Sequence, residues 1–233
     1  MKKLIFTFSL FLCAVLQGAD IPANYKLLYQ QGFDDASALD GFQFTDRNAW
    51  KWVSAGDDHG GAMELVKQSD YKPVVRSPVN IALIAGNVFN DFVLEVELIQ
   101  TGKEYGHRDM CIFYGFQSPT NFYYTHIATA ADPNAHNTFI VDGAPRKNFA
   151  KETTKGVNWG LNVWHKVRIE RTVGDGMIKV YFDDMTKPIM VAQNDKFKSG
   201  GIGFGSFDDT GRVDNIKIWG PSVEKRKVAE FSK

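Results

Sequence analysis

Short runs of apolar and aromatic residues, separated by turn-forming residues about every ten positions, constrain the fold of this chain most strongly. From residue 25 onward, Gly, Asp, Asn and Pro stand between these runs. Such spacing is typical of all-β sandwiches and barrels. No segment carries a sustained helical period, so long helices are not expected. Aromatic residues make up 13% of the chain, which suits a pleated sheet, where such side chains pack well.

The alternation of side chains predicts where the strands lie. The expected strands are 26–33, 41–45, 49–53, 62–66, 74–84, 91–100, 108–116, 121–129, 136–142, 164–172, 177–183, 188–193, 201–207 and 212–219. A turn at Gly174 to Gly176 predicts one hairpin, and Gly211 predicts a second one between the last two strands. The stretch 143–163 has no clean period and is expected to be a long loop.

The first twenty residues have the pattern of a secretory signal peptide. Lys2 and Lys3 precede an apolar run from Leu4 to Leu16, and small residues follow at Gly18 and Ala19. The run is short for a membrane span of about 20 residues. We therefore expect a signal peptide at 1–18, one domain at 19–220 and a charged tail at 221–233 that frays. The protein is expected to be secreted or periplasmic, with no transmembrane segment after cleavage.

Charge and cysteine content exclude several classes of function. The 27 basic and 27 acidic residues leave no basic excess for binding nucleic acid. Removal of the leader takes Cys13 away and leaves Cys111 alone, which excludes an intrachain disulfide and any zinc site with several cysteines. We interpret Cys111 as a small buried hydrophobic residue. No helix is expected after the glycine-rich stretch 200–206, so it is not a nucleotide loop, and no organic cofactor is expected.

The C-terminal third carries a recognisable combination of segments: NVWHKVRIER, GMIKVYFDD, KPIMVAQ and GGIGFGSFDDTGRVDNIKIWG, with DFVLEVELIQ upstream. This combination resembles the concanavalin A-like jelly rolls of bacterial secreted proteins. Among these are family 16-like glycoside hydrolases, 3-keto-disaccharide hydrolase domains and laminin-G-like modules. The resemblance covers about residues 25–220 and implies an all-β, two-sheet antiparallel jelly-roll sandwich. The resemblance does not identify an activity, because enzymes, lectins and adhesion modules all share this fold.

The resemblance departs from family 16 at the catalytic strand. Those enzymes carry two glutamates and an aspartate on one strand, and no such strand is present. Glu95 and Glu97 share one face of the expected strand 91–100. We interpret this pair as the solvated face of the strand.

Residues 104–148 carry the strongest functional signal, because three of the five histidines fall there: His107, His126 and His136. The period of two places Tyr124 and His126 on one face of the strand 121–129. Arg108 and Asn137 lie on the strands before and after. Hairpin pairing would bring them alongside, on one concave sheet face.

Two classes of function use such residues. The first is an enzyme that cleaves a polysaccharide or modified disaccharide, as a glycoside hydrolase-like protein or a lyase. Arg108 or Asn137 would then neutralise a carboxylate, His126 would act as base and Tyr124 as acid. The second is a non-catalytic carbohydrate-binding or adhesion module. In both, the candidate substrate-binding residues are Asp109, Tyr114, His136, Asn137, Asp142, Arg146 and Lys147. A third interpretation makes Tyr124 and His126 structural core residues.

The resemblance also implies one structural calcium ion, which concanavalin A-like sandwiches often hold on the convex side. The matching positions are Asp34 or Asp35 and Asp214, completed by backbone carbonyls. The alternative is that Asp34 and Asp35 form a turn and that Asp214 makes a cross-strand pair. The acidic pairs at 183–184 and 208–209 are interpreted as turn residues.

Overall fold

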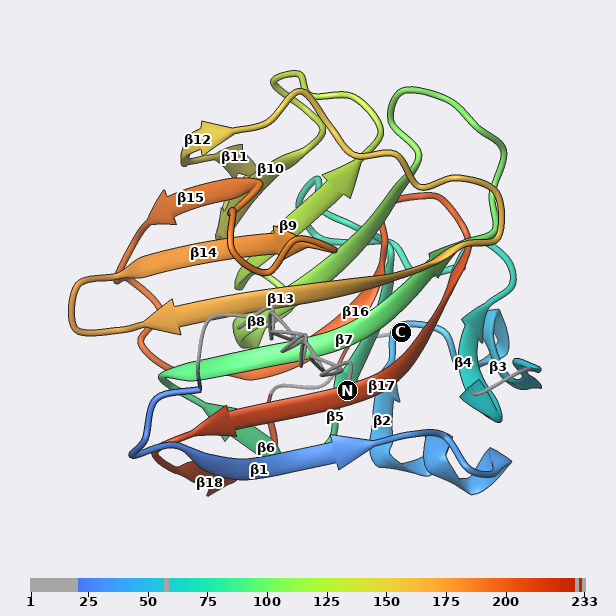
Figure 1. Ribbon diagram of the computed structural model, residues 1–233, viewed down its shortest axis with the longest axis horizontal. Coiled ribbons are helices and arrows are strands. Elements are labelled where there is room, and N and C mark those ends of the chain that lie inside the picture. Colours follow the sequence, from blue (N-terminus) through green and yellow to red (C-terminus); the bar gives the residue numbers. More distant parts are fainter. Residues whose placement is uncertain (1–20, 57–58, 229–230, 232–233) are drawn as a thin grey trace, which may run out of the picture.

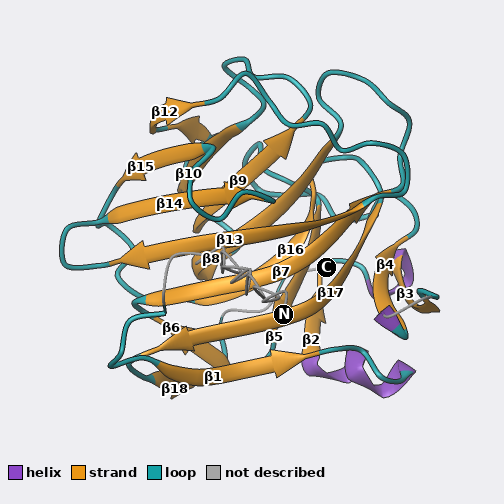
Figure 2. Ribbon diagram, viewed as in Figure 1, coloured by secondary structure: helices purple, strands orange, loops and turns teal. Residues whose placement is uncertain are grey.

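The computed structural model describes residues 21–56, 59–228 and 231. Two antiparallel sheets lie face to face (Figure 1). Figure 2 shows strands and loops throughout, with helical turns only near β2 and β3. These turns are η1 (Ala36–Gly41) and η2 (Arg47–Ala49). The strand spacing predicted an all-β sandwich or barrel, and the resemblance implied a two-sheet jelly-roll sandwich; the sandwich is confirmed.

The larger sheet has nine strands. Its order is β12 (Ala150–Thr153), β15 (Met190–Gln193), β14 (Met177–Phe182), β13 (Trp164–Thr172), β7 (Phe92–Gln100), β17 (Gly211–Gly220), β4 (Gly61–Leu65) and β3 (Trp50–Ser54), with β1 (Lys26–Gln31) also paired to β17. The second sheet has seven strands. Its order is β11 (Lys147–Asn148), β10 (Asn137–Asp142), β9 (Asn121–Ala128), β8 (Asp109–Ser118), β16 (Gly201–Ser206), β5 (Asn80–Ile84) and β2 (Phe42–Phe44). A small separate sheet pairs β18 (Val223–Lys225) with β6 (Asn87–Phe89).

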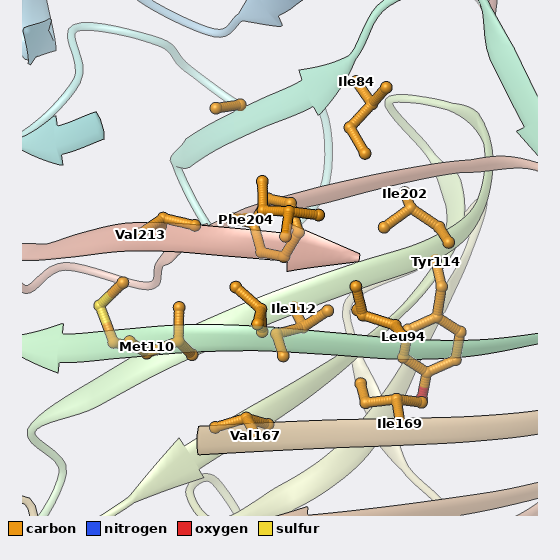
Figure 3. Packing of buried hydrophobic residues seen from close by; sticks show 14 of the residues in the cluster. Ile84, Leu94, Met110, Ile112, Tyr114, Val167, Ile169, Ile202, Phe204 and Val213 are labelled. Carbon is orange, nitrogen blue, oxygen red and sulfur yellow. The ribbon is translucent and has the colours of Figure 1, made fainter. Parts of the chain in front are cut away.

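The main core fills the space between the two sheets (Figure 3). Leu94 and Ile169 of the nine-stranded sheet meet Ile112, Tyr114 and Phe204 of the seven-stranded sheet. All five side chains are fully buried. Alternation sends every second residue of β7, β8, β13 and β16 into this layer, which is why their sequences show the period of two.

A second apolar layer covers the outer face of the seven-stranded sheet. Its buried members are Ile81, Leu83, Val88, Cys111, Phe113, Phe116, Phe122, Tyr124, Phe139, Val141 and Val228. Val75, from the segment 66–79, and Phe231, from the C-terminal tail, pack on it. The aromatic face predicted for β9 is therefore real, but it is covered and not an open concave surface. Cys111 is buried, as expected.

Four predictions about local structure are wrong. The strand expected at 74–84 begins only at Asn80, because Pro78 cannot donate to a strand ladder. The expected long loop 143–163 contains β11 and β12. The tail does not simply fray, since β18 pairs with β6.

The predicted second hairpin is the fourth error. β16 belongs to the seven-stranded sheet, whereas β17 pairs with β1, β4 and β7 in the other sheet. The intervening residues 207–210 therefore cross between the sheets, and we call them the crossing loop. The hairpin between β13 and β14 is confirmed.

The expected signal peptide lies outside the described residues. Within the described ranges, no helix is both long enough and apolar enough to cross a membrane.

Candidate functional site

A pocket of about 180 Å³ opens where several loops meet one end of the seven-stranded sheet. It is lined by Arg76, Tyr105, His107, His126, Asn134, Arg146, Phe207 and Asp208. His126 comes from β9, near its end, and the other residues come from loops, including the crossing loop. The lining thus combines two guanidinium groups, two imidazoles, a carboxylate, an amide and two aromatic rings.

Arg146 is held in this pocket by aromatic rings. Its Cζ lies 4.3 Å from the ring centre of Phe207 and 4.7 Å from that of Phe139. Its Nη1 donates a 2.8 Å hydrogen bond to Oη of Tyr124. These contacts fix the guanidinium plane through cation–π attraction and one hydrogen bond. Nη1 is the one guanidinium nitrogen that bonds to a described residue, so the others keep N–H donors for a ligand.

Beneath the pocket, three side chains from β8 and β9 meet. Asp109 and Cys111 point to the same side of β8, and Cys111 lies directly opposite His126 on β9. Sγ of Cys111 donates to Oδ2 of Asp109 at 3.0 Å, and Nε2 of His126 lies 3.2 Å from the same oxygen. That approach does not have hydrogen-bond geometry, and neither ring nitrogen of His126 has a hydrogen-bond partner among the described residues.

Asp109 also anchors the crossing loop. Its carboxylate accepts hydrogen bonds from Oγ of Ser206 at 2.9 Å and from the amide of Phe207 at 3.1 Å. Burial raises the pKa of Asp109, but the charge of His126 and the hydrogen bonds outweigh it and leave the pKa lowered. Burial, reinforced by the charge of Asp109, raises the pKa of the Cys111 thiol well above its ordinary value.

The crossing loop adds two carboxyl groups that the sequence analysis interpreted as turn residues. Oδ2 of Asp209 accepts hydrogen bonds from Oη of Tyr105 at 2.9 Å and from the amide of Asp109 at 3.0 Å. Burial, then the charge of Asp109, raises the pKa of Asp209 to about 7. The same two causes raise the pKa of Asp208. An acidic pair one residue beyond the glycine-rich strand was the available signal for these residues.

The predicted cluster is brought together only in part. Tyr124 and His126 share a face, as expected, and Asn137 lies opposite His126 in the register of β9 and β10. Tyr124 is fully buried beneath Arg146. Oδ1 of Asn137 accepts a hydrogen bond from the amide of Ala150 at 3.1 Å, so this side chain is engaged in holding an edge of the structure.

Arg108 is not where the prediction put it. It is buried, and its Nη2 donates to the carbonyl of Gln100, in the opposite sheet, at 3.1 Å. The predicted catalytic set of Arg108, His126 and Tyr124 therefore does not meet on one open surface. The prediction for Tyr114 is also wrong, because its side chain lies in the core between the sheets. Its Oη lies 3.1 Å from Oγ1 of Thr125.

The remaining predicted binding residues lie outside the pocket lining. His136 is fully buried; its Nδ1 accepts from the amide of Ala128 at 3.3 Å, and its Nε2 lies 2.9 Å from Oγ1 of Thr154. Asp142 pairs with Lys196. Lys147 is exposed.

Two of the three expected calcium ligands make other contacts. Oδ1 of Asp35 accepts the amide of Ser37 and caps η1, as the turn interpretation expected. Oδ2 of Asp214 instead lies 2.9 Å from Nδ1 of His59, beside Glu97. Neither Asp34 nor Asp35 belongs to a cluster of three or more metal-ligating groups in the described part of the chain.

A larger hollow of about 690 Å³ lies near β2 and η2, and two of its charged side chains, Asp46 and Arg47, are engaged in local hydrogen bonds. Asp46 caps η2 and accepts the amide of Asp70, and Arg47 donates to the carbonyl of Trp50. The smaller pocket is the better candidate because it holds a buried imidazole with unbonded nitrogens.

The chain matches no protein-family model and no curated protein. Its fold is shared with solved structures. A protein of unknown function with a galectin-like fold from Bacillus subtilis is 11% identical, with a TM-score of 0.56 over 88% of this chain and 99% of that chain. Domain 4 of an extracellular arabinanase from Geobacillus stearothermophilus, in complex with arabinotriose, is 11% identical, with a TM-score of 0.51 over 88% and 95%.

A carbohydrate-binding module, CBM66, from Bacillus subtilis is 17% identical, with a TM-score of 0.50 over 79% of this chain and 95% of that chain. At these identities the likeness shows the fold alone.

Proposed function

We propose that the protein binds carbohydrate in the pocket beside Arg146. The observation that carries the proposal is the lining itself, in which a fixed guanidinium group stands among other hydrogen-bonding side chains and exposed aromatic surface. Sugar hydroxyls need several donors and acceptors at once, while the C–H faces of a sugar ring pack on aromatic rings. Arg76, Asn134 and Asp208 supply the former, and Tyr105, 44% exposed, supplies the latter.

The size of the pocket favours one sugar residue. Sites for drug-sized ligands occupy about 300–1,000 Å³, and this pocket measures about 180 Å³. We infer recognition of a single residue of a glycan, with the rest of the glycan outside the pocket. The solved domain with arabinotriose and the carbohydrate-binding module support the proposal, because the same fold carries sugar binding in those proteins.

Binding is preferred to cleavage on geometric grounds. Two of the three predicted catalytic groups are out of reach of the pocket: Arg108 faces the opposite sheet, and Tyr124 is sealed beneath Arg146. Cleavage of the glycan is therefore the alternative that the experiment must exclude.

The test is calorimetric titration against a panel of neutral and uronate-containing oligosaccharides, with parallel assays for new reducing ends and for unsaturated products. Arg146→Gln and Arg76→Gln should each weaken binding about tenfold or more, since a hydrogen bond to a charged group contributes about 1.5–3 kcal/mol. Arg76 is exposed, so its loss leaves the fold intact. Arg226→Gln, at an exposed arginine paired with Glu224, is the matched control and should bind normally.

Two results would reject the proposal: no binding across the panel, or affinities in the pocket variants equal to that of the control. Release of reducing ends or unsaturated sugars would replace it with the enzyme alternative.

A further inference from the structure

We propose that Asp109, Cys111 and His126 form a site for one transition-metal ion of the zinc type. The three side chains each offer one ligand atom, and these atoms all lie within 4.8 Å of one another. Strand geometry sets this arrangement: Asp109 and Cys111 are two residues apart on β8, and His126 is the cross-strand partner of Cys111. The ligands therefore stand on rigid, hydrogen-bonded strands.

The unbonded imidazole of His126 is the independent observation that points to a ligand. Its side chain is only 4% exposed, and neither ring nitrogen makes a hydrogen bond to a described residue. Leaving a buried polar group without a partner costs about 1–3 kcal/mol, and such groups are rare in folded proteins. A metal ion bound at Nε2 would take the place of a proton there, beside Oδ2 of Asp109 at 3.2 Å.

The donor set identifies the class of metal. Calcium and magnesium prefer oxygen ligands alone, whereas zinc binds cysteine sulfur, histidine nitrogen and carboxylate oxygen. Zinc–ligand bonds of about 2.0–2.3 Å place the ligands of a tetrahedral site about 3.3–3.8 Å apart. The distances from Oδ2 of Asp109 to Sγ of Cys111, 3.0 Å, and to Nε2 of His126, 3.2 Å, need only small adjustments to match.

The pocket gives the metal a route and a fourth ligand. His126 lies in the pocket lining, so an ion entering the pocket reaches its imidazole. Asp208 lines the same pocket, and a carboxylate oxygen of Asp208 lies within 4.8 Å of one of Asp109. Asp208 does not belong to the cluster of Asp109, Cys111 and His126, so a water molecule entering through the pocket would complete the tetrahedron. On binding, the S–H bond of Cys111 is replaced by a sulfur–metal bond, and the proton passes to solvent.

A second cluster, His59 with Glu97 and Asp214, is the natural comparison. Its histidine is satisfied, because Nδ1 pairs with Asp214 at 2.9 Å and the ring stacks on Trp164 at 4.2 Å. This cluster also lacks sulfur. The two clusters can therefore be told apart by a measurement that detects only metal–sulfur bonds.

The experiment is a Co²⁺ titration of the metal-free full chain carrying Cys13→Ser, so that Cys111 is its only thiol. We expect a sulfur-to-cobalt charge-transfer band in the near ultraviolet that saturates at one equivalent and disappears when Zn²⁺ is added. Cys111→Ser should abolish the band. His126→Asn should weaken Co²⁺ binding by more than tenfold, since loss of even an outer partner of a metal ligand costs about 10–100-fold. His59→Ala is the control and should keep the band.

Circular dichroism establishes that each variant is folded. If Cys111→Ser does not fold, the Cys13→Ser titration alone decides. Absence of the band in that folded protein at saturating Co²⁺ would overturn the proposal, as would a band that persists in folded Cys111→Ser.

Discussion

His136 should make the stability of this protein depend on pH in the mildly acidic range. The side chain is fully buried, with one ring nitrogen accepting from the amide of Ala128 and the other beside Thr154. Burial lowers the pKa of His136 from 6.5 to about 4; the hydrogen bond from Ala128 opposes this shift, and the charge of His126 adds to it. The native state therefore holds this imidazole neutral.

The sign and size of the effect follow from proton linkage. As the pH falls below 6.5, the unfolded chain takes up a proton on His136 while the folded protein does not. The contribution of His136 to the free energy of unfolding is complete above pH 6.5 and is lost progressively as the pH falls to about 4. At about 1.4 kcal/mol for each pKa unit, the loss amounts to about 3 kcal/mol.

His136→Asn isolates this effect. His136 has a φ of 49°, a conformation that asparagine tolerates better than most residues, and the amide oxygen can replace Nδ1 as an acceptor. Urea denaturation at several pH values between 4 and 8 would measure the free energy of unfolding of both proteins. The variant should be the less stable protein at pH 8, and the difference should shrink or reverse by about 3 kcal/mol at pH 4. A difference that stays constant with pH would refute the reasoning.

Two further substitutions test the packing of the sheets. A Cβ at Gly205 would lie 1.9 Å from the carbonyl oxygen of Asn80, so Gly205→Ala should force β5 and β16 apart. In urea denaturation this variant should lose about 2 kcal/mol or more of stability, whereas Gly41→Ala, where the added Cβ meets open space, should have little effect. Equal unfolding midpoints for the two variants would contradict this account. Arg171 is buried, and it donates to the carbonyl of Phe197 but leaves Nε and Nη1 unbonded. In thermal unfolding, Arg171→Met should therefore be neutral or stabilising, while Arg171→Ala should lose about 3 kcal/mol of stability because it leaves a cavity. Equal losses in the two variants would show that the charge stabilises the fold.

The long strands were predictable because each of them has a buried face, whereas β11, β12 and β18, which have no buried residue, were not predicted. β7, β8, β13 and β16 send alternate residues into one core, and that period of two is visible in the sequence. The turn residues at 208–211 correctly predicted a change of direction, but they carry no information on which sheet receives the next strand. That is why the predicted hairpin of β16 with β17 became a crossing loop.

Sequence patterns do not show how the two sheets are placed against each other, and this also explains why the candidate site was predicted only in part. Tyr124 and His126 share a face through a local rule, the alternation along one strand. Arg108 is the residue before β8, one position away from Asp109, and therefore has the opposite parity to Asp109 and Cys111. Its contact with Gln100 depends on how the two sheets stack, which the sequence pattern does not encode. Asp208 and Asp209 reach the site only because the chain crosses between sheets.

The proposed sugar pocket and the proposed metal site both depend on Asp109. Its carboxylate holds the crossing loop through Ser206 and Phe207, and it is also the central ligand of the proposed metal site. Phe207 in turn forms one side of the aromatic clamp on Arg146. An ion bound at Asp109 would therefore act directly on the anchor of the loop that shapes the sugar pocket. The side chains of Arg76 and Asn134, in contrast, are exposed and make no hydrogen bond to Asp109 among the described residues, so they would act on a sugar without acting on this anchor.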